Sequence, residues 1–505
     1  MKRRPSTSPQ IDRSSTGILG LDDILLGGLP TGNLYVVQGE PGVGKTTLAL
    51  HFLLAGTRIG ERGLYVSFSE TEKELMSVAA SHNWNLNNIT ILDLSSIQKA
   101  IKAEDGRKPP EGGDGTRRYL RALLAEAKKA RVNRLVIDGV AEFSVGAPDP
   151  FEYRNQLMQL KEGFGSGTTT LVLRDNTMPS QHTHLESVAH GMIGLEKSES
   201  GFGAEQRRLR IIKLRGSQFR AGFHNFVIEE GGLQVFPRLI AAEHVATFTR
   251  TPLSSGIPEL DALLGGGLDK GTSTLFTGPS GTGKSTMAIY FAAQAAKRGD
   301  KVVIYSFEES IGLTVHRCRS LGMDLTNDLE NSTIVLRQIN PGELSPGQFA
   351  FDIKNSVLTN GVSFVVIDSL NGYLNAMPDE RFLLIQLHEL LMFLAQQGVI
   401  TILTVAQPGG VLPRVPDVDV SYLADAVVLL RYFEALGSVR TAISAVKKRS
   451  SDHEHTIREF SITSRGLQVG DVIKEFQGVL TGTPTYTGTT SPPLLQPKTP
   501  KKKRR

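Results

Sequence analysis

GEPGVGKT, at residues 39–46, recurs as GPSGTGKS at residues 278–285. Both segments fit the pattern G-x-x-x-x-G-K-[ST], in which glycines let backbone N–H groups wrap a phosphate, the lysine reaches the terminal phosphates and the hydroxyl holds Mg²⁺. The repeated pattern predicts two sites for ATP and Mg²⁺. The residues expected to bind ATP are Gly39, Gly42, Gly44, Lys45, Thr46, Thr47, Gly278, Gly281, Gly283, Lys284, Ser285 and Thr286.

The two loops belong to longer segments that keep a constant register. TGILGLD at residues 16–22 matches SGIPELD at residues 255–261, and these segments lie 239 residues apart, as do Lys45 and Lys284. An unbroken register over this length is typical of an internal repeat. The sequence therefore predicts two copies of one nucleotide-binding domain.

Each copy alternates between strand-like and helix-like segments. Apolar runs at residues 34–38 and 273–277 lead into the loops, and later runs at 134–137 and 364–367 each end before an aspartate. Continuous apolar runs are typical of strands that are covered on both faces of a parallel sheet, and their alternation with helices favours an α/β, doubly wound core. We therefore expect two tandem α/β P-loop domains, each a mostly parallel sheet flanked by helices.

Chain length and composition suggest where these domains begin and end. A chain of 505 residues with 40% hydrophobic residues suits two globular domains rather than one. We expect a disordered basic N-terminus at residues 1–12, domains at 13–245 and 246–480, and a disordered basic tail at 481–505. Residues 103–116 have no counterpart in the second half and are predicted to form an exposed loop.

The basic charge is concentrated at the two ends of the chain. The net charge is +5, but the first ten residues hold three basic side chains, the last eight hold six, and neither end has an acid. The body between them therefore carries four more acidic than basic residues, which argues against a broad nucleic-acid-binding face. The tail allows two interpretations: a solvated end, or a segment that contacts nucleic acid or an acidic protein partner.

Cysteine content and hydropathy favour a cytoplasmic protein without a membrane segment. Cys318 is the single cysteine, which excludes an intramolecular disulfide and suits a reducing compartment. The N-terminus lacks the apolar region of a signal peptide, and strongly apolar stretches such as 399–406 are too short to span a bilayer.

An aspartate ends a predicted strand in each half. Asp138 follows LVI and Asp368 follows VVI. An acid at this place organises Mg²⁺ together with the loop hydroxyl in P-loop enzymes, so the predicted metal-binding residues are Thr46, Asp138, Ser285 and Asp368. The alternative is that each aspartate only caps the helix that follows its strand.

The two halves differ in a pair of acids. FEES at residues 307–310 corresponds to FSET at residues 68–71, so Glu308 and Glu309 face Ser69 and Glu70 in the alignment. A carboxylate near the γ-phosphate can accept a proton from water or from a hydroxyl. We therefore predict a more complete set of catalytic residues in the second half. Solvated surface acids are the alternative.

A pair of basic residues near the end of each half also matches. Lys213 and Arg215 correspond to Lys447 and Arg449, and alternation along a strand places each pair on one face. Such a pair can reach a neighbouring subunit's γ-phosphate in trans. An ordinary exposed strand face is the competing interpretation.

Two histidine pairs suggest a metal site at first sight. They are His182 with His184 and His453 with His455. Neither has a third histidine or a cysteine at a recognised spacing, so structural or surface histidines are the favoured interpretation.

The tandem loops, the paired [TS]-G-I-x-x-L-D openings, FEES, VIDS, KLRG and KKRS together resemble the double-domain KaiC proteins, the RecA-like ATPases of the cyanobacterial circadian clock and their bacterial relatives. The resemblance covers about residues 13–480. It implies RecA-like domains, a homohexameric double ring that binds ATP between subunits, a slow ATPase in the first half, and an autokinase that removes its own phosphates in the second. The family's catalytic residues fall on Glu70, Glu308, Glu309, Lys213, Arg215, Lys447 and Arg449.

The family's neighbouring phosphorylated Ser and Thr fall on Ser421 and Tyr422. Ser421 keeps the hydroxyl, so a one-site Ser/Thr autokinase that acts in signalling is the leading hypothesis. Two alternatives stay open: a RecA-like nucleic-acid-dependent ATPase, and a scaffold that ATP assembles with little turnover.

Overall fold

The computed structural model describes residues 12–96, 98, 124–127, 129–139, 154–155, 158–159, 162, 167–176, 183–198, 205–340, 342–374, 380–407, 420–435, 437–480 and 484–488. The predicted basic N-terminus up to residue 11, the predicted loop 103–116, His182 and the basic cluster 498–505 lie outside the described residues. The chain divides into two compact units, Met1–Arg238 and Leu239–Arg505.

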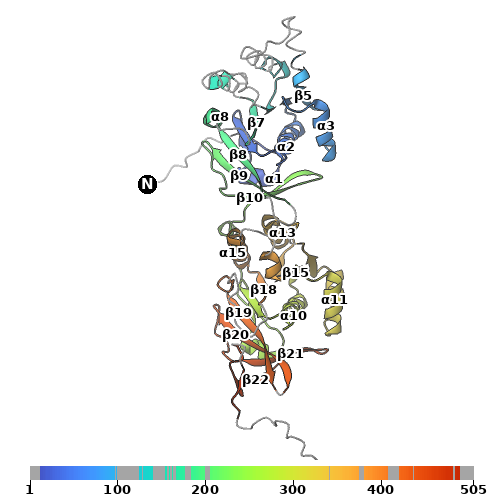
Figure 1. The fold of residues 1–505 in the computed structure, drawn as a ribbon, viewed down its shortest axis with the longest axis vertical. Helices are drawn as coiled ribbons and strands as arrows, with labels where there is room; N and C mark the ends of the chain where they lie inside the picture. The colour runs from blue at the N-terminus through green and yellow to red at the C-terminus, as the bar shows by residue number, and fades with distance from the viewer. Residues whose placement is uncertain are drawn as a thin grey trace, which may run out of the picture. The chain divides into compact units, whose positions relative to one another are not determined.

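Unit 1 is built on a nine-stranded sheet with the strand order β11-β10-β9-β8-β3-β7-β6-β4-β5 (Figure 1). The strands from β8 to β5 in this order run parallel, and β8 to β11 form an antiparallel extension. The elements are β1 (Arg13–Ser14), α1 (Leu19–Ile24), β2 (Leu29–Pro30), β3 (Leu34–Gly39), α2 (Lys45–Arg58), β4 (Gly63–Ser67), α3 (Glu72–Ser81), β5 (Ile89–Asp93), β6 (Arg134–Asp138), β7 (Thr169–Asp175), α8 (Thr183–Val188), β8 (Gly191–Ser198), β9 (Gln206–Leu214), β10 (His224–Glu229) and β11 (Gly232–Phe236).

Unit 2 has a nine-stranded sheet in the order β16-β15-β17-β18-β14-β19-β20-β21-β22. Its elements are η1 (Ala241–Glu243), β12 (Pro252–Leu253), α9 (Pro258–Leu263), β13 (Leu268–Asp269), β14 (Ser273–Gly278), α10 (Lys284–Lys297), β15 (Lys301–Ser306), α11 (Ile311–Ser320), α12 (Thr326–Glu330), β16 (Ile334–Gln338), α13 (Pro346–Leu358), β17 (Val362–Asp368), α14 (Leu370–Leu374), α15 (Glu380–Gln396), β18 (Ile400–Ala406), β19 (Ala426–Ala435), β20 (Ser438–Lys448), β21 (Arg458–Thr463), β22 (Gly466–Val472), β23 (Phe476–Gln477) and β24 (Thr485–Tyr486).

The two sheets have the same strand order when one is read in reverse, with β3 equivalent to β14 and β9 equivalent to β20. The predicted α/β fold with two mostly parallel, helix-flanked sheets is thereby confirmed. Within the segment predicted to be a tail, Thr485 and Tyr486 form β24, which pairs with β23.

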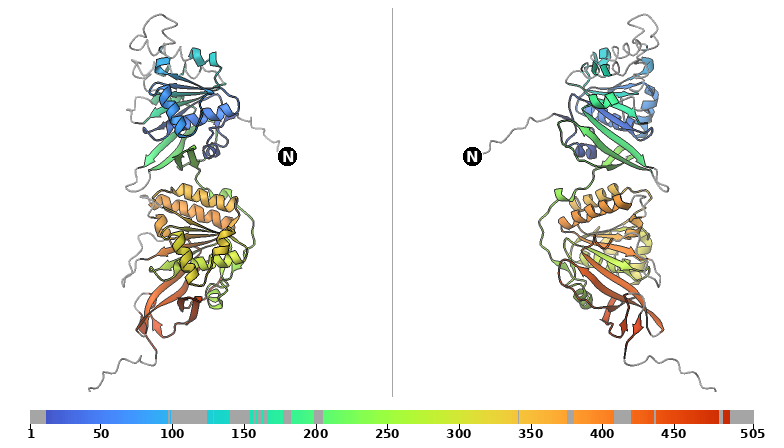
Figure 2. Two further views of the ribbon diagram at one scale, coloured as in Figure 1. Left: turned by 90° about the vertical axis from the view of Figure 1, so that its right-hand side faces the viewer. Right: turned by 60° about the vertical axis from the view of Figure 1, so that its left-hand side comes forward.

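Alternate residues of the central strands belong to cores on opposite faces of each sheet. Tyr35 and Val37 pack in one cluster of unit 1, and Leu34 and Val36 pack in the other. In unit 2, helices α10 and α11 cover one face and α13 and α15 cover the other (Figure 2). Because both faces are covered, the central strands are apolar throughout, as the sequence pattern indicates.

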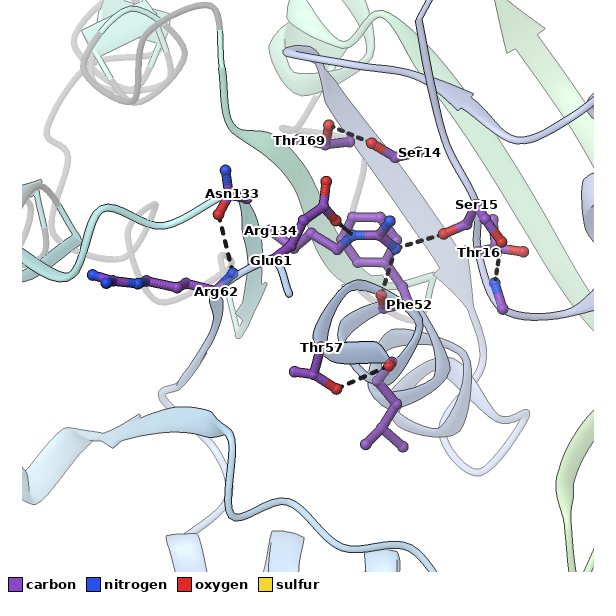
Figure 3. A network of polar contacts seen from close by, with 12 residues as sticks. Ser14, Ser15, Thr16, Phe52, Thr57, Glu61, Arg62, Asn133, Arg134 and Thr169 are labelled. Atoms are coloured by element: carbon purple, nitrogen blue, oxygen red, sulfur yellow. Dashed lines mark hydrogen bonds and ion pairs between the residues drawn. The ribbon is translucent and has the colours of Figure 1, made fainter. Parts of the chain in front are cut away.

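Arg134 is the largest fully buried side chain of the chain's described part, and it lies in unit 1 with 1% of its surface exposed. Its Nε is ion-paired with Glu61, and its Nη1 donates to the carbonyls of Ser15 (2.5 Å) and Phe52 (2.7 Å; Figure 3). The guanidinium also lies over the Phe52 ring, 4.7 Å from its centroid. Strand register places Phe364 at the equivalent point of unit 2, where an apolar side chain fills the space.

None of the helices in the described ranges combines the length and the apolar content that a bilayer crossing needs.

Candidate functional site

The P-loop of each unit joins the central strand of the sheet to the first long helix. Gly44 caps α2 with φ +111°, and Gly283 caps α10 with φ +96°. Gly42 and Gly281 also have positive φ. These conformations are rare for residues with a Cβ. In phosphate-binding loops such glycines let successive backbone N–H groups approach an anion at a helix N-terminus, so the positive φ values are consistent with the predicted ATP-binding segments.

In unit 1, the P-loop lysine lies over its own loop. Lys45 Nζ donates to the carbonyls of Gly39 (3.0 Å) and Glu40 (2.9 Å) and is ion-paired with Asp175 at the end of β7. The sequence interpretation missed Asp175, although a charged residue at a strand end beside the loop is a usable signal. Thr47, the last residue of the predicted segment, is buried.

Asp138 lies at the end of β6, and its Oδ2 accepts a hydrogen bond from the Tyr65 hydroxyl (2.9 Å). Burial raises the pKa of Asp138, while Tyr65 and Lys45 oppose that rise. The Tyr65 hydroxyl also interacts with Thr46, which joins the two predicted metal-binding residues of this unit. Burial raises the pKa of Glu70, and the charge of Asp138 adds to the effect, so the structure brings Glu70 to the same edge.

In unit 2, the loop hydroxyl and the strand-end acid are in direct contact. Ser285 Oγ donates to Asp368 Oδ1 (2.9 Å), and the Thr404 hydroxyl donates to the same oxygen. Burial raises the pKa of Asp368. Lys284 Nζ donates to the Pro279 carbonyl (2.8 Å), and burial lowers the pKa of Lys284. Hydroxyl and carboxylate oxygens are the donors that Mg²⁺ prefers, so Ser285 and Asp368 fit that ion.

The two predicted acids of unit 2 have different partners. Ser369 donates to Glu308 Oε1, and the Glu308 side chain is exposed. Arg317 Nη2 and Nε instead donate to both oxygens of Glu309 (2.7 and 3.1 Å). Sequence reasoning treated the two acids as equivalent, and it missed Arg317, because its contact with Glu309 depends on how α11 packs.

The basic pairs lie at the ends of β9 and β20 and bind the segments that precede the paired strands β8 and β19. Lys213 Nζ donates to the Glu186 carbonyl (2.7 Å) and Arg215 to the Ser187 carbonyl (2.8 Å). In the same pattern, Lys447 donates to the Ser421 carbonyl (2.8 Å) and Arg449 to that of Tyr422 (3.3 Å). These matching hydrogen bonds make Glu186 the counterpart of Ser421.

The structure adds a third donor to one histidine pair. Atoms of Asp452, His453 and His455 that can bind metal lie within 4.8 Å of one another, and no other such group of three occurs among the described residues. Asp452 and His455 are exposed. His182 is outside the described residues, as is the side chain of His184.

Comparisons with known proteins agree with this geometry. A family model described as "ATPase: KaiC" matches residues 14–240 and 253–473. The circadian clock oscillator protein KaiC of Parasynechococcus marenigrum is 27% identical over 497 residues, which cover 95% of this chain and 94% of that protein. The circadian clock protein KaiC3 of Synechocystis is 27% identical, with 94% and 95% covered, and the KaiC of Synechococcus elongatus is 27% identical, with 94% and 92% covered.

Proposed function

Because the chain belongs to the KaiC family of ATPases, we propose that it is a signalling ATPase whose C-terminal unit phosphorylates its own Ser421. ATP is the phosphoryl donor, and Ser285 and Asp368 would hold Mg²⁺, which would neutralise charge on the phosphates of ATP. Self-association into a hexameric double ring is part of the proposal, since Lys447 and Arg449 then act on a neighbour's nucleotide. The basic residues near the two ends of the chain are proposed to contact protein partners.

The contact between Lys447 and Ser421 is the observation that carries the proposal. Lys447 Nζ donates to the carbonyls of both Ser421 (2.8 Å) and Ala424 (2.7 Å), so the predicted phosphate-facing cation also fixes the backbone of the predicted acceptor. Holding donor and acceptor in one geometry is the main source of rate in phosphoryl transfer. Lys447 is therefore proposed both to contact the γ-phosphate and to position the Ser421 backbone.

The proposed transfer is a displacement at the γ-phosphorus of ATP. The Ser421 oxygen forms a bond to the γ-phosphorus while the bond to the β–γ bridging oxygen breaks, and ADP leaves with that electron pair. Glu308 accepts the hydroxyl proton, which its exposed carboxylate at the end of β15 can do. In the later dephosphorylation, the oxygen of a water molecule forms a bond to the phosphorus while the bond to the Ser421 oxygen breaks, so that inorganic phosphate leaves and Ser421 regains its hydroxyl proton.

The first unit is proposed to hydrolyse ATP without phosphorylating itself. Glu186 occupies the position of Ser421, and its carboxylate is paired with Arg174 (3.0 Å), so this position offers no acceptor hydroxyl. Ser69 replaces the first acid of the pair, which leaves Glu70 as the carboxylate for hydrolysis.

Incubation of the purified full-length protein with γ-labelled ATP tests the proposal. Ser421→Ala is expected to remove most of the label, whereas the matched variant Tyr422→Phe keeps it. Label that persists undiminished in Ser421→Ala refutes the acceptor. Sizing with and without ATP, alongside ADP release, separates the alternatives: near-zero turnover with ATP-dependent assembly indicates a scaffold. DNA-stimulated hydrolysis that survives deletion of residues 481–505 indicates a nucleic-acid-dependent ATPase.

A further inference from the structure

Equivalent glutamates of the two units have different hydrogen-bond partners. Glu70 and Glu309 occupy the same place in the 239-residue register, directly before α3 and α11. Eight residues further along, unit 1 has Val78 and unit 2 has Arg317. One arginine therefore distinguishes the surroundings of the two carboxylates.

Arg317 makes three hydrogen bonds from the last turn of α11. Its Nε and Nη2 bind Glu309 Oε1 (3.1 Å) and Oε2 (2.7 Å) in a bidentate pair, and its Nη1 donates to Thr286 Oγ1 (2.7 Å). The side chains of Arg317 and Glu309 are 24% and 21% exposed, so solvent screens the pair only in part. Because Thr286 follows Ser285 in the first turn of α10, the guanidinium ties Glu309 to the start of the P-loop helix.

In the described part of unit 1, no hydrogen-bonded side chain links the equivalent glutamate to the P-loop helix. Glu70 Oε2 is buried there without a hydrogen-bond partner, and Val78 packs against the apolar core. Burial raises the pKa of Glu70, with Asp138 and Glu74 adding to the rise. Burial acts in the same direction on Glu309, but the hydrogen bonds and charge of Arg317, together with a hydrogen bond from Thr314, outweigh it, and the pKa of Glu309 is lowered.

We propose that Arg317 is a positioning residue of the C-terminal site: it keeps Glu309 ionised and fastened to α10, and so leaves Glu308 as the one carboxylate of the pair that receives the proton. This inference rests on the proposed ATP turnover of unit 2. Glu309 then serves as an anchor, and its substitution acts through α10 rather than through proton transfer.

The charges around Glu309 determine how its protonation responds to loss of the arginine. Arg317 and Cys318 face it from α11, Glu308 adjoins it, and Asp368 at the end of β17 interacts with Arg317 and with Lys284 of α10. Without Arg317, burial still raises the pKa of Glu309 and the hydrogen bond from Thr314 opposes that rise, so Glu309 takes up a proton at higher pH than in the wild type.

The test uses full-length protein with Lys45→Ala, so that ATP turnover reports on unit 2. Arg317→Met is expected to lower kcat about tenfold through misplacement of α10. Adding Glu309→Gln to Arg317→Met lowers kcat no further, because the two residues act as one unit whose link to α10 is already lost. Arg317→Lys restores part of kcat. Arg319→Met, on the same helix but bonded to Thr326 (3.1 Å), leaves kcat unchanged.

The outcomes separate this inference from the proposed function. If the Lys45→Ala protein neither turns over ATP nor labels itself, the proposed function of unit 2 fails. If that protein is active and Arg317→Met keeps its kcat, the inference about Arg317 is overturned. Should Arg317→Met fail to fold, Arg317→Lys and Glu309→Gln carry the same comparison: both are expected to lower kcat, and a wild-type kcat in each contradicts the tether.

Discussion

Lys45 of the first P-loop is ion-paired with Asp175, whereas the strand register places Ala406 at the equivalent position of unit 2. The Lys45 side chain is 11% exposed and that of Asp175 is 47% exposed. A phosphate that binds the loop must share or displace this carboxylate, since both are anions that approach the same ammonium group. The two nucleotide sites are therefore not electrostatically equivalent.

Replacing Asp175 with alanine is expected to strengthen ATP binding at unit 1 about fivefold, the effect of removing one partly exposed ion pair. Asp175→Asn, which keeps the shape and loses the charge, should give most of the gain. Titration with a fluorescent ATP analogue in a Lys284→Ala background isolates the first site. Weaker binding in either variant contradicts the prediction and places Asp175 among the groups that hold the nucleotide.

Gly283→Ala is expected to abolish ATP binding at unit 2. A Cβ on this residue lies 2.3 Å from Ile462 Cδ1 and 3.1 Å from Phe460 Cε1, and the residue has φ +96°, so either these side chains or the loop must shift to accept it. Gly299→Ala is the matched control, since that residue has φ +92° with open space around it. Both variants carry similar backbone strain, of about 1 kcal/mol. Nucleotide stoichiometry is the measurement, and two bound nucleotides per Gly283→Ala chain would sink the prediction.

Arg134→Met is expected to destabilise unit 1 by about 3 kcal/mol, because Glu61 and the carbonyls of Ser15 and Phe52 lose their common donor. Arg62→Met is the control. Arg62 is exposed and its side chain donates to the Ala130 carbonyl (3.2 Å), so its loss is expected to cost less than about 0.5 kcal/mol. Calorimetry that resolves the two units is the measurement. An unchanged first transition in Arg134→Met contradicts the assigned role.

The fold could be predicted from the sequence because its signals are local. Apolar runs ending in Asp138 and Asp368 identify buried parallel strands, and the constant register reveals the duplication. The family membership followed from the same motifs and is confirmed. Strands β10 and β11 of the antiparallel extension were not anticipated, because short strands joined by turns carry little periodic signal.

The contacts within the site were harder to predict because they join distant parts of the chain. Asp175 reaches Lys45 only because β7 pairs with β3, and Arg317 reaches Thr286 only because α11 packs beside α10. Neither spacing is a motif. The catalytic, metal-binding and acceptor roles of the P-loop, acidic and basic residues, Ser421 included, stay predictions.

Two histidines of unit 1, the half-buried His51 and the buried His224, must stay neutral to keep their hydrogen bonds. His51 Nε2 accepts from the backbone N–H of Leu233 (2.9 Å), and His224 Nδ1 accepts from that of Arg238 (2.8 Å). Burial is the main cause that lowers the pKa of each from 6.5 to about 4. Trp84, the single tryptophan of the chain, lies edge-on to His51 with ring centroids 4.5 Å apart, so its fluorescence reports on this region.

Unit 1 is therefore expected to lose stability as the pH falls from about 6.5 toward 4. A lowered folded-state pKa means that the unfolded chain binds protons first, so the stabilisation is complete above pH 6.5 and decreases below it, by on the order of 2 kcal/mol for each histidine at pH 5. Glu70 and Asp138, whose pKa values burial raises, act in the opposite direction. His51→Gln keeps an acceptor for Leu233 but cannot titrate, so denaturant unfolding followed by Trp84 fluorescence should depend less on pH in this variant than in the wild type. An equal pH dependence in both proteins would show that His51 is not the titrating group.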